Sequence, residues 1–300
     1  MTRFFVIFNP AARGERSRRV RQFLDSQSNG LVTLAPTERP GDAKQLAAQA
    51  VTDGYEMIVA AGGDGTINEV VNGIGQSGVS LGILPGGTVN VLAQDLGIPR
   101  RLVDAWSMIK RGNARTIDLA QAECGGEKRF FLQLAGVGFD ARAVRAASWE
   151  LKKKIGPLSY IWAGLQTLSR PHTHVDVSIN GDTPHARGVA VLVGNGRFYG
   201  GPFRVFPKAS MEDGLLDVCV FERGGYLDML RYGQGILRAA HVRFRDVCYF
   251  QAKEFTCTAA VPVPFQLDGE DAGDVPVGFS VVPGALRVII PTPAERKNYA

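Results

Sequence analysis

Residues 62–73 read Gly62-Gly63-Asp64-Gly65-Thr66-Ile67-Asn68-Glu69-Val70-Val71-Asn72-Gly73, directly after the apolar run Met57 to Ala61. Glycine has no Cβ, so a loop rich in glycine lets the backbone approach a ligand closely. The pattern that follows is helical, and a helix N-terminus offers unpaired N–H groups and a positive dipole end to a phosphate. The aspartate would repel a bare phosphate, but it suits a divalent cation bound to one. The stretch therefore predicts a loop for a metal–nucleotide complex.

Strand and helix patterns alternate over the first 120 residues. Strands are expected at 4–8, 31–34, 57–61 and 81–84, and helices at 15–26, at 42–51 with Asp42 as the cap, after the glycine loop, and up to Gly97. This order predicts a parallel sheet with crossover helices, which binds ligands at the carboxyl ends of its strands.

Three of these strands are followed by loops rich in Gly, Asn or Thr, at 9–14, 62–66 and 85–88. Neither glycine loop is a Walker A or a GxGxxG motif. A single glycine loop after a strand is often only a tight turn. Three such loops at one edge of a sheet favour nucleotide binding over coincidence.

Beyond residue 120 the pattern changes. Strands are expected at 175–179, 189–193, 215–221, 248–255, 277–282 and 286–290, and helices at 141–153 and 158–168. This pattern predicts a second, antiparallel β-rich domain. We expect a nucleotide-binding domain over 1–121, a β-rich acceptor domain over 122–291, and a tail over 292–300 that is loose or returns to the first domain.

Composition excludes few function classes. The chain has 300 residues, of which 45% are hydrophobic and 21% charged, as in a folded globular protein of two domains. The first apolar run is too short for a signal peptide, and no run approaches the roughly 20 apolar residues of a membrane-spanning helix. Four cysteines without CxxC spacing favour a reducing cytosol. A net charge of +5 permits a lipid surface, a nucleotide or a nucleic acid as partner without choosing among them.

Five short motifs together resemble the soluble diacylglycerol kinases and sphingosine kinase-like lipid kinases, and most closely their bacterial branch. The motifs are Asn9-Pro10, Gly62 to Thr66, Gly86-Gly87-Thr88, Asp213-Gly214-Leu215 and Leu267 to Glu270. The resemblance implies an N-terminal nucleotide domain like that of NAD kinases and 6-phosphofructokinases, a C-terminal β-sandwich-like domain, and an active site in the cleft between them. It also implies transfer of the γ-phosphoryl group of ATP, with Mg²⁺, to a hydroxyl of a lipid such as diacylglycerol or a sphingoid or ceramide lipid.

The same resemblance assigns residues to roles. Around the nucleotide it implies Asn9, Pro10, Ala11, Ala12, Arg13, Gly14, Thr37, Gly62, Gly63, Asp64, Gly65, Thr66, Ile67, Asn68, Gly87 and Thr88. It implies Glu270 as the catalytic base, and a carboxylate on a turn can accept the proton of the attacking hydroxyl. The alternative is an exposed loop glutamate in an acidic patch. Asp64 and Asp118 are the recognisable acidic residues for the catalytic magnesium.

Two further metal features depend on the resemblance. Asp213 and the backbone carbonyls of Ser210 and Leu215 match a structural magnesium loop, and their oxygen ligands suit that ion. An ordinary Asp-Gly turn is the competing interpretation. Many relatives carry an aspartate directly after Asn90, where this chain has Val91. Its absence leaves open how the catalytic magnesium is held.

The acceptor side is less well defined. The predicted helix 158–168, which follows Lys152-Lys153-Lys154, is either a membrane-contacting helix or a core-facing one. The loop 198–203 is either a lipid entrance or a simple turn. We expect a cytoplasmic protein with a lipid substrate, peripheral membrane contact and no nucleic acid, and a homodimer is one option. A kinase of a soluble hydroxyl compound and a sensor that has lost catalysis are the alternative functions.

Overall fold

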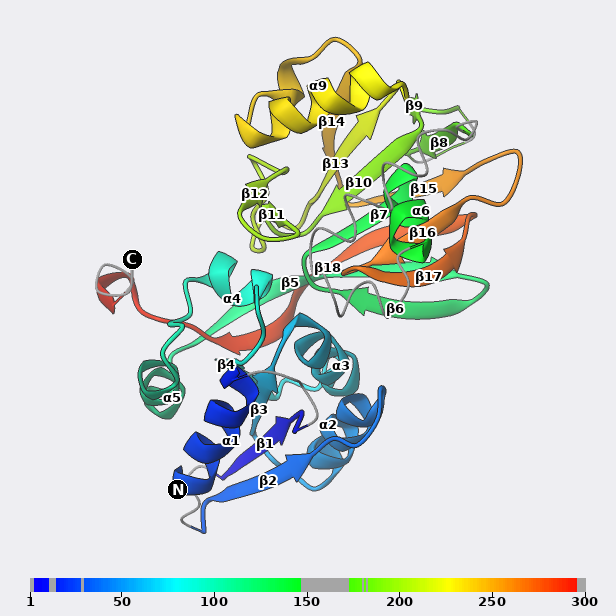
Figure 1. The fold of residues 1–300 in the computed structure, drawn as a ribbon. Helices are drawn as coiled ribbons and strands as arrows, with labels where there is room; N and C mark the ends of the chain where they lie inside the picture. The colour runs from blue at the N-terminus through cyan, green and yellow to red at the C-terminus, as the bar shows by residue number, and fades with distance from the viewer. Residues whose placement is uncertain are drawn as a thin grey trace. The chain divides into compact units, whose positions relative to one another are not determined.

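The computed structural model describes residues 3–10, 15–27, 30–146, 173–179, 181 and 183–295. The chain divides into two compact units, one of Met1–Leu119 with Pro283–Ala300 and one of Ala120–Val282. The chain passes between the units within two strands, β5 (Ala114–Cys124) and β18 (Val277–Ile289). The colours of Figure 1 follow this path, with both ends of the chain in the first unit.

The first unit is built on a parallel sheet in the order β2-β1-β3-β4. Its elements are β1 (Phe4–Phe8), α1 (Glu15–Gln27), β2 (Val32–Pro36), α2 (Asp42–Thr52), β3 (Met57–Gly62), α3 (Asp64–Ile74), β4 (Ser80–Pro85), α4 (Val91–Leu96) and α5 (Leu102–Arg111). Every residue of β1, β3 and β4 is buried, because helices cover both faces of a parallel sheet. In Figure 1, α2 and α3 lie to one side of it and α1 and α5 to the other. The predicted parallel sheet is confirmed.

One local prediction in this unit is wrong. Asp42 does not cap α2: the N-cap is Gly41, and no side chain caps the helix. Asp42 instead accepts hydrogen bonds from the backbone N–H groups of Glu38 and Arg39, at 2.9 and 3.0 Å, and so closes the turn before the helix. Those bonds lower the pKa of Asp42.

The second unit contains two large antiparallel groups of strands and one small antiparallel pair. Its elements are the rest of β5, β6 (Glu127–Phe131), β7 (Leu134–Gly138), α6 (Phe139–Ala146), β8 (Val175–Ser178), β9 (Ala186–Gly188), β10 (Ala190–Gly194), β11 (Phe198–Tyr199), β12 (Phe203–Arg204), β13 (Leu216–Phe221), α9 (Tyr226–Leu237), η1 (His241–Arg243), β14 (Val247–Ala252), β15 (Glu254–Thr258), β16 (Pro264–Leu267), β17 (Glu270–Asp274) and the start of β18. One sheet has the order β14-β13-β10-β7-β16-β17. In the other group, β15 pairs with β18 and β8, β8 with β9, and β5 with β6.

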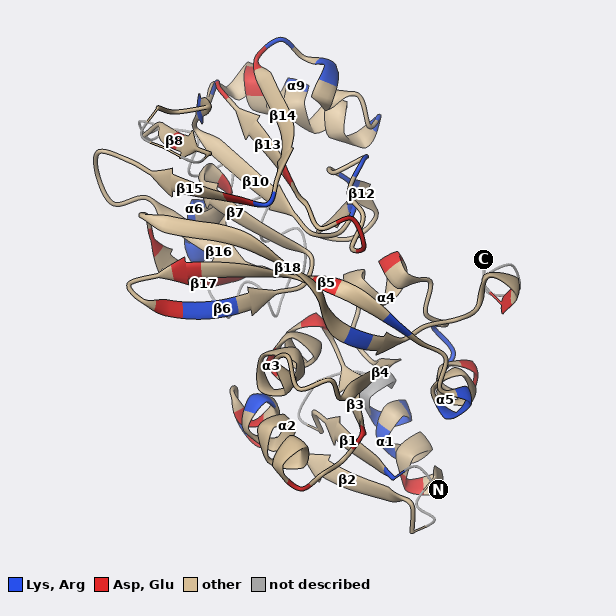
Figure 2. Cartoon of the chain, turned by 180° about the vertical axis from the view of Figure 1, so that it is seen from behind, with Lys and Arg blue, Asp and Glu red and all other residues tan. Residues whose placement is uncertain are grey.

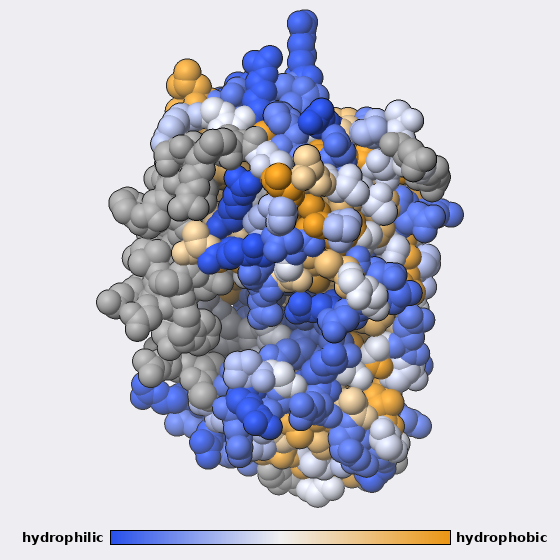
Figure 3. All heavy atoms as spheres, turned by 90° about the vertical axis from the view of Figure 1, so that its right-hand side faces the viewer, coloured by the Kyte–Doolittle hydropathy of each residue, from blue (hydrophilic) through white to orange (hydrophobic). Residues whose placement is uncertain are grey.

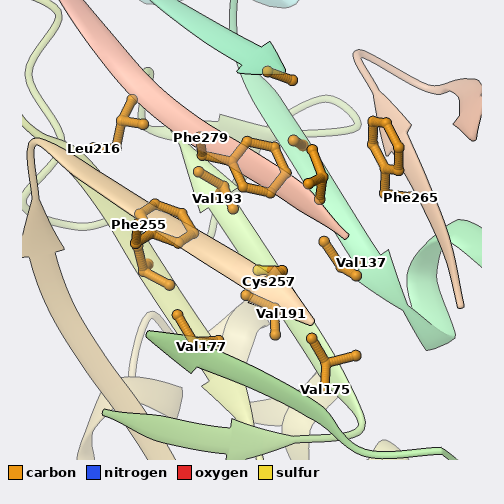
Figure 4. Packing of buried hydrophobic residues seen from close by; sticks show 14 of the residues in the cluster. Val137, Val175, Val177, Val191, Val193, Leu216, Phe255, Cys257, Phe265 and Phe279 are labelled. Atoms are coloured by element: carbon orange, nitrogen blue, oxygen red, sulfur yellow. The ribbon is translucent and has the colours of Figure 1, made fainter. Parts of the chain in front are cut away.

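The core of this unit lies between the two sheets. Figure 4 shows side chains of β15 and β18 directed toward those of β7, β10 and β16. Phe279 is central: its ring lies 5.3 Å from that of Phe255 in its own sheet and 6.5 Å from that of Phe265 in the facing one. A dry core between two sheets defines a β-sandwich, so the predicted β-sandwich-like domain is confirmed.

Three predictions for the second unit are corrected. Residues 248–255 were expected as one strand, but β14 ends at Ala252 and pairs with β13, whereas β15 starts at Glu254 and pairs with β18. The expected strands 277–282 and 286–290 are one strand, β18. Helix α9 was not predicted. The helix expected at 141–153 is observed as α6, and its residues from 147 onward, with the whole of 158–168, lie outside the described residues.

Two contacts link residues 290 and 295 to the helix α5 region of the first unit, and residues 296–300 lie outside the described residues. Arg111 forms an ion pair with Glu295, and the Asn113 side chain donates to the carbonyl of Ile290. All four cysteines are free thiols. Among the described residues, no helix combines the length and the apolar character needed to cross a membrane.

Candidate functional site

The two glycine loops of the first unit lie against each other. Strands β3 and β4 are parallel neighbours, with Gly62 opposite Pro85, and the N–H of Gly86 donates to the carbonyl of Gly62 at 2.9 Å. A Cβ on Gly87 would lie 2.6 Å from the Cα of Gly63. Only glycine fits at position 87, because a side chain there would push the two loops apart.

Asn90 joins the two loops. Its side chain is buried, accepts the N–H of Gly87 at 2.8 Å and donates to the carbonyl of Gly62 at 2.9 Å. Its φ of 54° is left-handed, a conformation that asparagine tolerates better than most residues. The sequence analysis did not assign Asn90 to the site. Its place after Gly87-Thr88 was the only available signal, and that pattern does not reveal a bond to Gly62.

Helix α3 begins inside the first glycine loop. Gly63 is its N-cap, and no side chain among the described residues caps it. A helix N-terminus of this kind can bind an anion. Asp64 lies in this first turn, and its Oδ1 accepts the N–H of Leu92 at 3.4 Å. The side chain of Ile67 is fully buried in the helix's inner face. Of the predicted nucleotide residues, Ile67 can therefore contribute only its backbone.

The remaining nucleotide residues follow β1 and β2. Asn9 and Pro10 come directly after β1, and Thr37 follows β2, where its N–H donates to the carbonyl of Phe8 at 2.9 Å. The strands are parallel, so their carboxyl ends meet at one edge. The structure thus brings Asn9, Thr37, Gly62 to Asn68, Gly87 and Thr88 to that edge. Ala11, Ala12, Arg13 and Gly14 lie outside the described residues.

Asp118 lies on β5 and is buried. Its Oδ1 accepts the N–H of Gly284 at 2.8 Å, which ties β5 to β18 within the first unit. Val91, which replaces the relatives' aspartate, is the first residue of α4 and is also buried. The side chain at position 91 therefore offers no oxygen to a metal, and Asp64 and Asp118 are the predicted acidic residues that remain.

In the second unit, Glu270 begins β17 immediately after a two-residue turn. The turn residues Asp268 and Gly269 both have positive φ, 47° and 88°, and Leu267 pairs with Glu270 across it. This is the hairpin geometry that an Asp-Gly pair favours. The turn presents Glu270 at the end of a tight hairpin, where its side chain is exposed.

Asp268 fastens this turn to β7. Its carboxylate accepts three backbone N–H groups, those of Leu132, Gln133 and Leu134, at 2.7, 3.0 and 3.1 Å. Its own N–H donates to the carbonyl of Leu134 at 2.9 Å. Hydrogen bonds to a charged carboxylate are the stronger kind, so the turn is held rigidly.

A series of hydrogen-bonded side chains, which includes the buried Gln266, supports the turn. Gln266 accepts the N–H of Gly269 at 2.7 Å and donates to Asp140 at 2.8 Å, and Asp140 also accepts the hydroxyl of Tyr199. These hydrogen bonds link the loop 198–203 to Gly269, the residue before Glu270. Sequence reasoning missed Asp140 and Gln266, because their contact joins positions far apart in the sequence.

The acidic patch around Glu270 is largely neutralised. Arg145 of α6 forms ion pairs with Asp271 and Asp274, at 2.8 and 2.9 Å, and these bonds raise its pKa. The side chain of Glu270 forms neither a hydrogen bond nor an ion pair within the described part of the chain. Among the acids of this patch, Glu270 is thus the one left to act on a ligand.

The stability of the Asp140 network should depend on pH. Burial raises the pKa of Asp140 above its usual 3.8, although the bonds from Tyr199 and Gln266 oppose the shift. The folded state therefore retains this proton to higher pH than the unfolded state, and the free energy of unfolding falls as pH rises through the window above 3.8.

The Asp140→Asn variant has no proton to lose at this position. Urea denaturation from about pH 4 to pH 8 should show the wild type losing stability relative to Asp140→Asn as the pH rises. Because the other carboxylates are common to both proteins, the difference isolates Asp140. Parallel stability curves for the two proteins would contradict this prediction.

The predicted structural metal loop precedes β13. Asp213 is exposed and its Oδ1 accepts the N–H of Leu215 at 3.0 Å, while the hydroxyl of Ser210 accepts the N–H of Glu212 at 3.3 Å. One carboxylate and backbone carbonyls form an oxygen-only set of the kind magnesium prefers. Within the described ranges, no three His, Cys, Asp or Glu side chains gather as a metal cluster. A metal here must therefore use carbonyls and water.

Comparison with known proteins gives a consistent assignment over the whole chain. The model of the diacylglycerol kinase catalytic domain matches residues 3–122, and that of the YegS C-terminal NAD kinase beta sandwich-like domain matches residues 134–290. The diacylglycerol kinase of Bacillus subtilis is 30% identical over 97% of each chain, and that of Staphylococcus carnosus is 29% identical over 98% of this chain and 96% of its own.

Solved structures share the fold. A crystal structure of a diacylglycerol kinase from Bacillus anthracis has a TM-score of 0.76 to this chain, with 24% identity and 98% of each chain covered. A second structure from the same organism has a TM-score of 0.80 at 24% identity, covering 97% of this chain and 96% of its own.

Proposed function

Because the chain belongs to the diacylglycerol kinase family, we propose that it transfers the γ-phosphoryl group of ATP to a lipid hydroxyl. The acceptor class is diacylglycerol or a sphingoid or ceramide lipid. The observation that carries the proposal is Glu270, an exposed carboxylate without a partner in the described chain, on a turn fastened by three charged hydrogen bonds. A fixed turn holds a base in one position, as proton transfer requires.

ATP is assigned to the first unit. The N-terminus of α3, which no described side chain caps, and the close-packed glycines suit the β- and γ-phosphates, which need backbone donors and close approach. The carboxyl-end position of Asn9 and Thr37 suits the rest of the nucleotide. Asn90 keeps the two loops in register for this task.

Glu270 is assigned the proton of the acceptor hydroxyl. In phosphoryl transfer the nucleophile must lose this proton as it attacks, and a carboxylate in hydrogen-bond reach accepts it. Asp268, Gln266 and Asp140 act as positioning residues, because they hold the turn on which Glu270 stands.

Asp64 and Asp118 are the residues we propose for the catalytic Mg²⁺, which would neutralise charge on the transferring phosphoryl group. Without a carboxylate at Val91, water ligands would complete its coordination. A second, structural Mg²⁺ is proposed at Asp213 with the carbonyls of Ser210 and Leu215, where it would fix the turn into β13.

Substitution of Gly87 tests the nucleotide loops. In Gly87→Ala, the new Cβ would lie 2.6 Å from a backbone atom, so the loops must separate. We expect a loss of about 1–3 kcal/mol in the free energy of unfolding and a drop of about tenfold or more in ATP affinity. Urea denaturation and calorimetric titration with ATP measure the two effects.

Gly63→Ala is the matched control for stability. Its Cβ would come no closer than 3.6 Å to another atom, an ordinary contact, and Gly63 has an extended backbone. Its free energy of unfolding should stay within about 0.5 kcal/mol of wild type. Equal stability and ATP affinity in Gly87→Ala and wild type would contradict the proposed role of these loops.

The acceptor is identified by product analysis. Incubation of the protein with γ-labelled ATP, Mg²⁺ and a total lipid extract, followed by mass analysis of the labelled lipid, names the acceptor directly. Label in a soluble hydroxyl compound in the absence of lipid would instead support a NAD kinase-like activity. We also propose that the protein acts in the cytoplasm, in peripheral contact with the membrane that holds its acceptor.

A further inference from the structure

Helix α9 packs one side against the second unit. Met229, Tyr232 and Ile236 belong to the hydrophobic cluster that includes residues of β10, β13 and β14. Gly235 lies against the ring of Phe244, which brings the helix close to the segment that follows it. The hydrophobic contacts of this inner side attach α9 to the second unit, as they do for an amphipathic helix on the surface of a domain.

The outer side of α9 is also apolar. The exposed fractions of Tyr226, Leu227, Leu230 and Leu237 are 58%, 82%, 61% and 69%. Tyr226, Leu230 and Leu237 are spaced i, i+4 and i+11, which places them on one side of the helix. Phe203 of β12, 40% exposed, belongs to a strand in contact with α9. These five are most of the seven large hydrophobic side chains exposed in the described chain, so the apolar surface is concentrated here.

The clustering of exposed hydrophobic side chains indicates a binding surface more strongly than the exposure of single ones does. Figure 3 shows one side of the molecule, where hydrophobic residues are scattered among hydrophilic ones. Scattered exposed residues need no explanation, whereas a contiguous apolar surface marks a partner. We call Phe203, Tyr226, Leu227, Leu230 and Leu237 the α9 face.

Arginines are frequent in the segments that carry the α9 face. Between residues 222 and 246 five arginines stand against three acids, and Arg204 on β12 adds another cation. Figure 2 shows the basic segments on α9, in the turn after it and on β12. The carboxylate of Asp246 forms ion pairs with Arg231 and Arg223. Arg238, Arg243 and Arg245 are exposed, and no ion pair to them occurs among the residues that the structure describes.

We propose that the α9 face docks on the surface of an anionic lipid bilayer. Leucines and a tyrosine beside a set of arginines match an interfacial helix, whose apolar side chains enter the acyl boundary while cations contact anionic headgroups. The inference rests on the proposed function, because a kinase whose acceptor is a lipid must work at a membrane.

Charge argues against a second copy of the chain as the occupant. A two-fold interface through α9 would bring the same surface of both copies together. The arginines of one copy would then face those of the other, and like charges in an interface are costly. An anionic bilayer offers its acyl boundary to the leucines and its negatively charged headgroups to the arginines.

Vesicle co-sedimentation tests the proposal. The probes are vesicles of phosphatidylglycerol with phosphatidylcholine, and vesicles of phosphatidylcholine alone. The full chain should sediment with the anionic vesicles and be released by salt. The variant Leu227→Ser/Leu230→Ser/Leu237→Ser and the variant Arg238→Gln/Arg243→Gln/Arg245→Gln should each bind at least about tenfold more weakly.

Two matched controls carry equivalent changes elsewhere. Val103→Ser/Val261→Ser removes exposed apolar side chains, and Arg21→Gln/Arg100→Gln/Arg129→Gln removes exposed cations. Both controls should bind anionic vesicles as wild type does. All α9 substitutions are at exposed positions, so their melting temperatures should match the wild type and exclude unfolding as the cause.

Separate readouts distinguish failure of the docking site from failure of the kinase. Vesicle binding needs no turnover, and phosphorylation of diacylglycerol in neutral detergent micelles needs no bilayer. Reduced vesicle binding in the α9 variants, with wild-type turnover in micelles, supports docking. Wild-type vesicle binding by both α9 variants overturns it, whatever the activity. Sedimentation showing a dimer that the serine variant converts to monomer, with vesicle binding unchanged, also overturns it. Absence of kinase activity with α9-dependent vesicle binding leaves docking supported and rejects the kinase.

Discussion

Glu270→Gln should lower the rate of phosphoryl transfer to the lipid by about 10²–10⁴-fold, with ATP affinity unchanged. Glutamine has nearly the same shape as glutamate but cannot accept the proton of the attacking hydroxyl. The side chain makes no hydrogen bond or ion pair within the described chain, so its replacement leaves no partner unsatisfied and the fold should be kept. Initial rates with labelled ATP and diacylglycerol micelles, together with calorimetric titration of ATP, separate catalysis from binding.

Asp271→Asn is the matched control for this variant. Asp271 is the next residue on β17, but its carboxylate is bound by Arg145. Its loss weakens an exposed ion pair and should change the rate by only a few-fold. If Glu270→Gln turned over as fast as Asp271→Asn, the assignment of the base would be wrong.

Asp268→Ala should lower the free energy of unfolding by about 3–5 kcal/mol. Three backbone N–H groups lose a charged acceptor, and each such bond is worth about 1.5–3 kcal/mol before relaxation and water recover a part. Alanine is also strained at the positive φ of this position. Urea denaturation measures the change, and the rate of transfer should fall with it because Glu270 loses its fixed turn.

Two further variants should lose less stability than Asp268→Ala and serve as its controls. Asp268→Asn keeps an oxygen for Gln133 and Leu134 but presents an NH₂ group to Leu132, so it should cost about 1–2 kcal/mol. Asp274→Ala removes a carboxylate of the same hairpin that contacts only Arg145, and should cost about 0–1 kcal/mol. An Asp268→Ala protein as stable as Asp274→Ala would show that the three backbone bonds do not hold the turn.

The first unit follows closely from its sequence for local reasons. A parallel sheet covered on both faces needs continuous apolar runs, and Phe4 to Phe8 and Met57 to Ala61 are such runs. The glycine loops after them are local signals as well. Asn90 could not be assigned in the same way, because its bond to Gly62 spans 28 positions and depends on the pairing of β3 with β4.

The fold of the second unit could be predicted less completely from its sequence pattern. Residues 248–255 are a continuous strand candidate in the sequence, yet the chain changes sheets at Lys253, since β14 pairs with β13 and β15 with β18. The residue types of a strand carry no information on which strand it pairs with. Helix α9 was missed because Gly233 and Gly235 weaken its helical signal and because both of its sides are apolar.

The turn that carries Glu270 could be predicted from the sequence, whereas the contacts that support it could not. Asp268-Gly269 is a recognisable hairpin pair, so the turn could be expected from the sequence. Its support by Asp140 and Gln266 could not, because these side chains are 126 positions apart. Sequence therefore located the candidate base, and only the structure revealed what positions it.

The central claim is that this chain phosphorylates a lipid with ATP. Its most direct test is transfer of label from γ-labelled ATP to diacylglycerol in mixed micelles with Mg²⁺, with the product identified by mass. We expect labelled phosphorylated lipid with the wild type and a loss of about 10²–10⁴-fold with Glu270→Gln. Tight ATP binding without label in diacylglycerol or in any lipid of a total extract would contradict it.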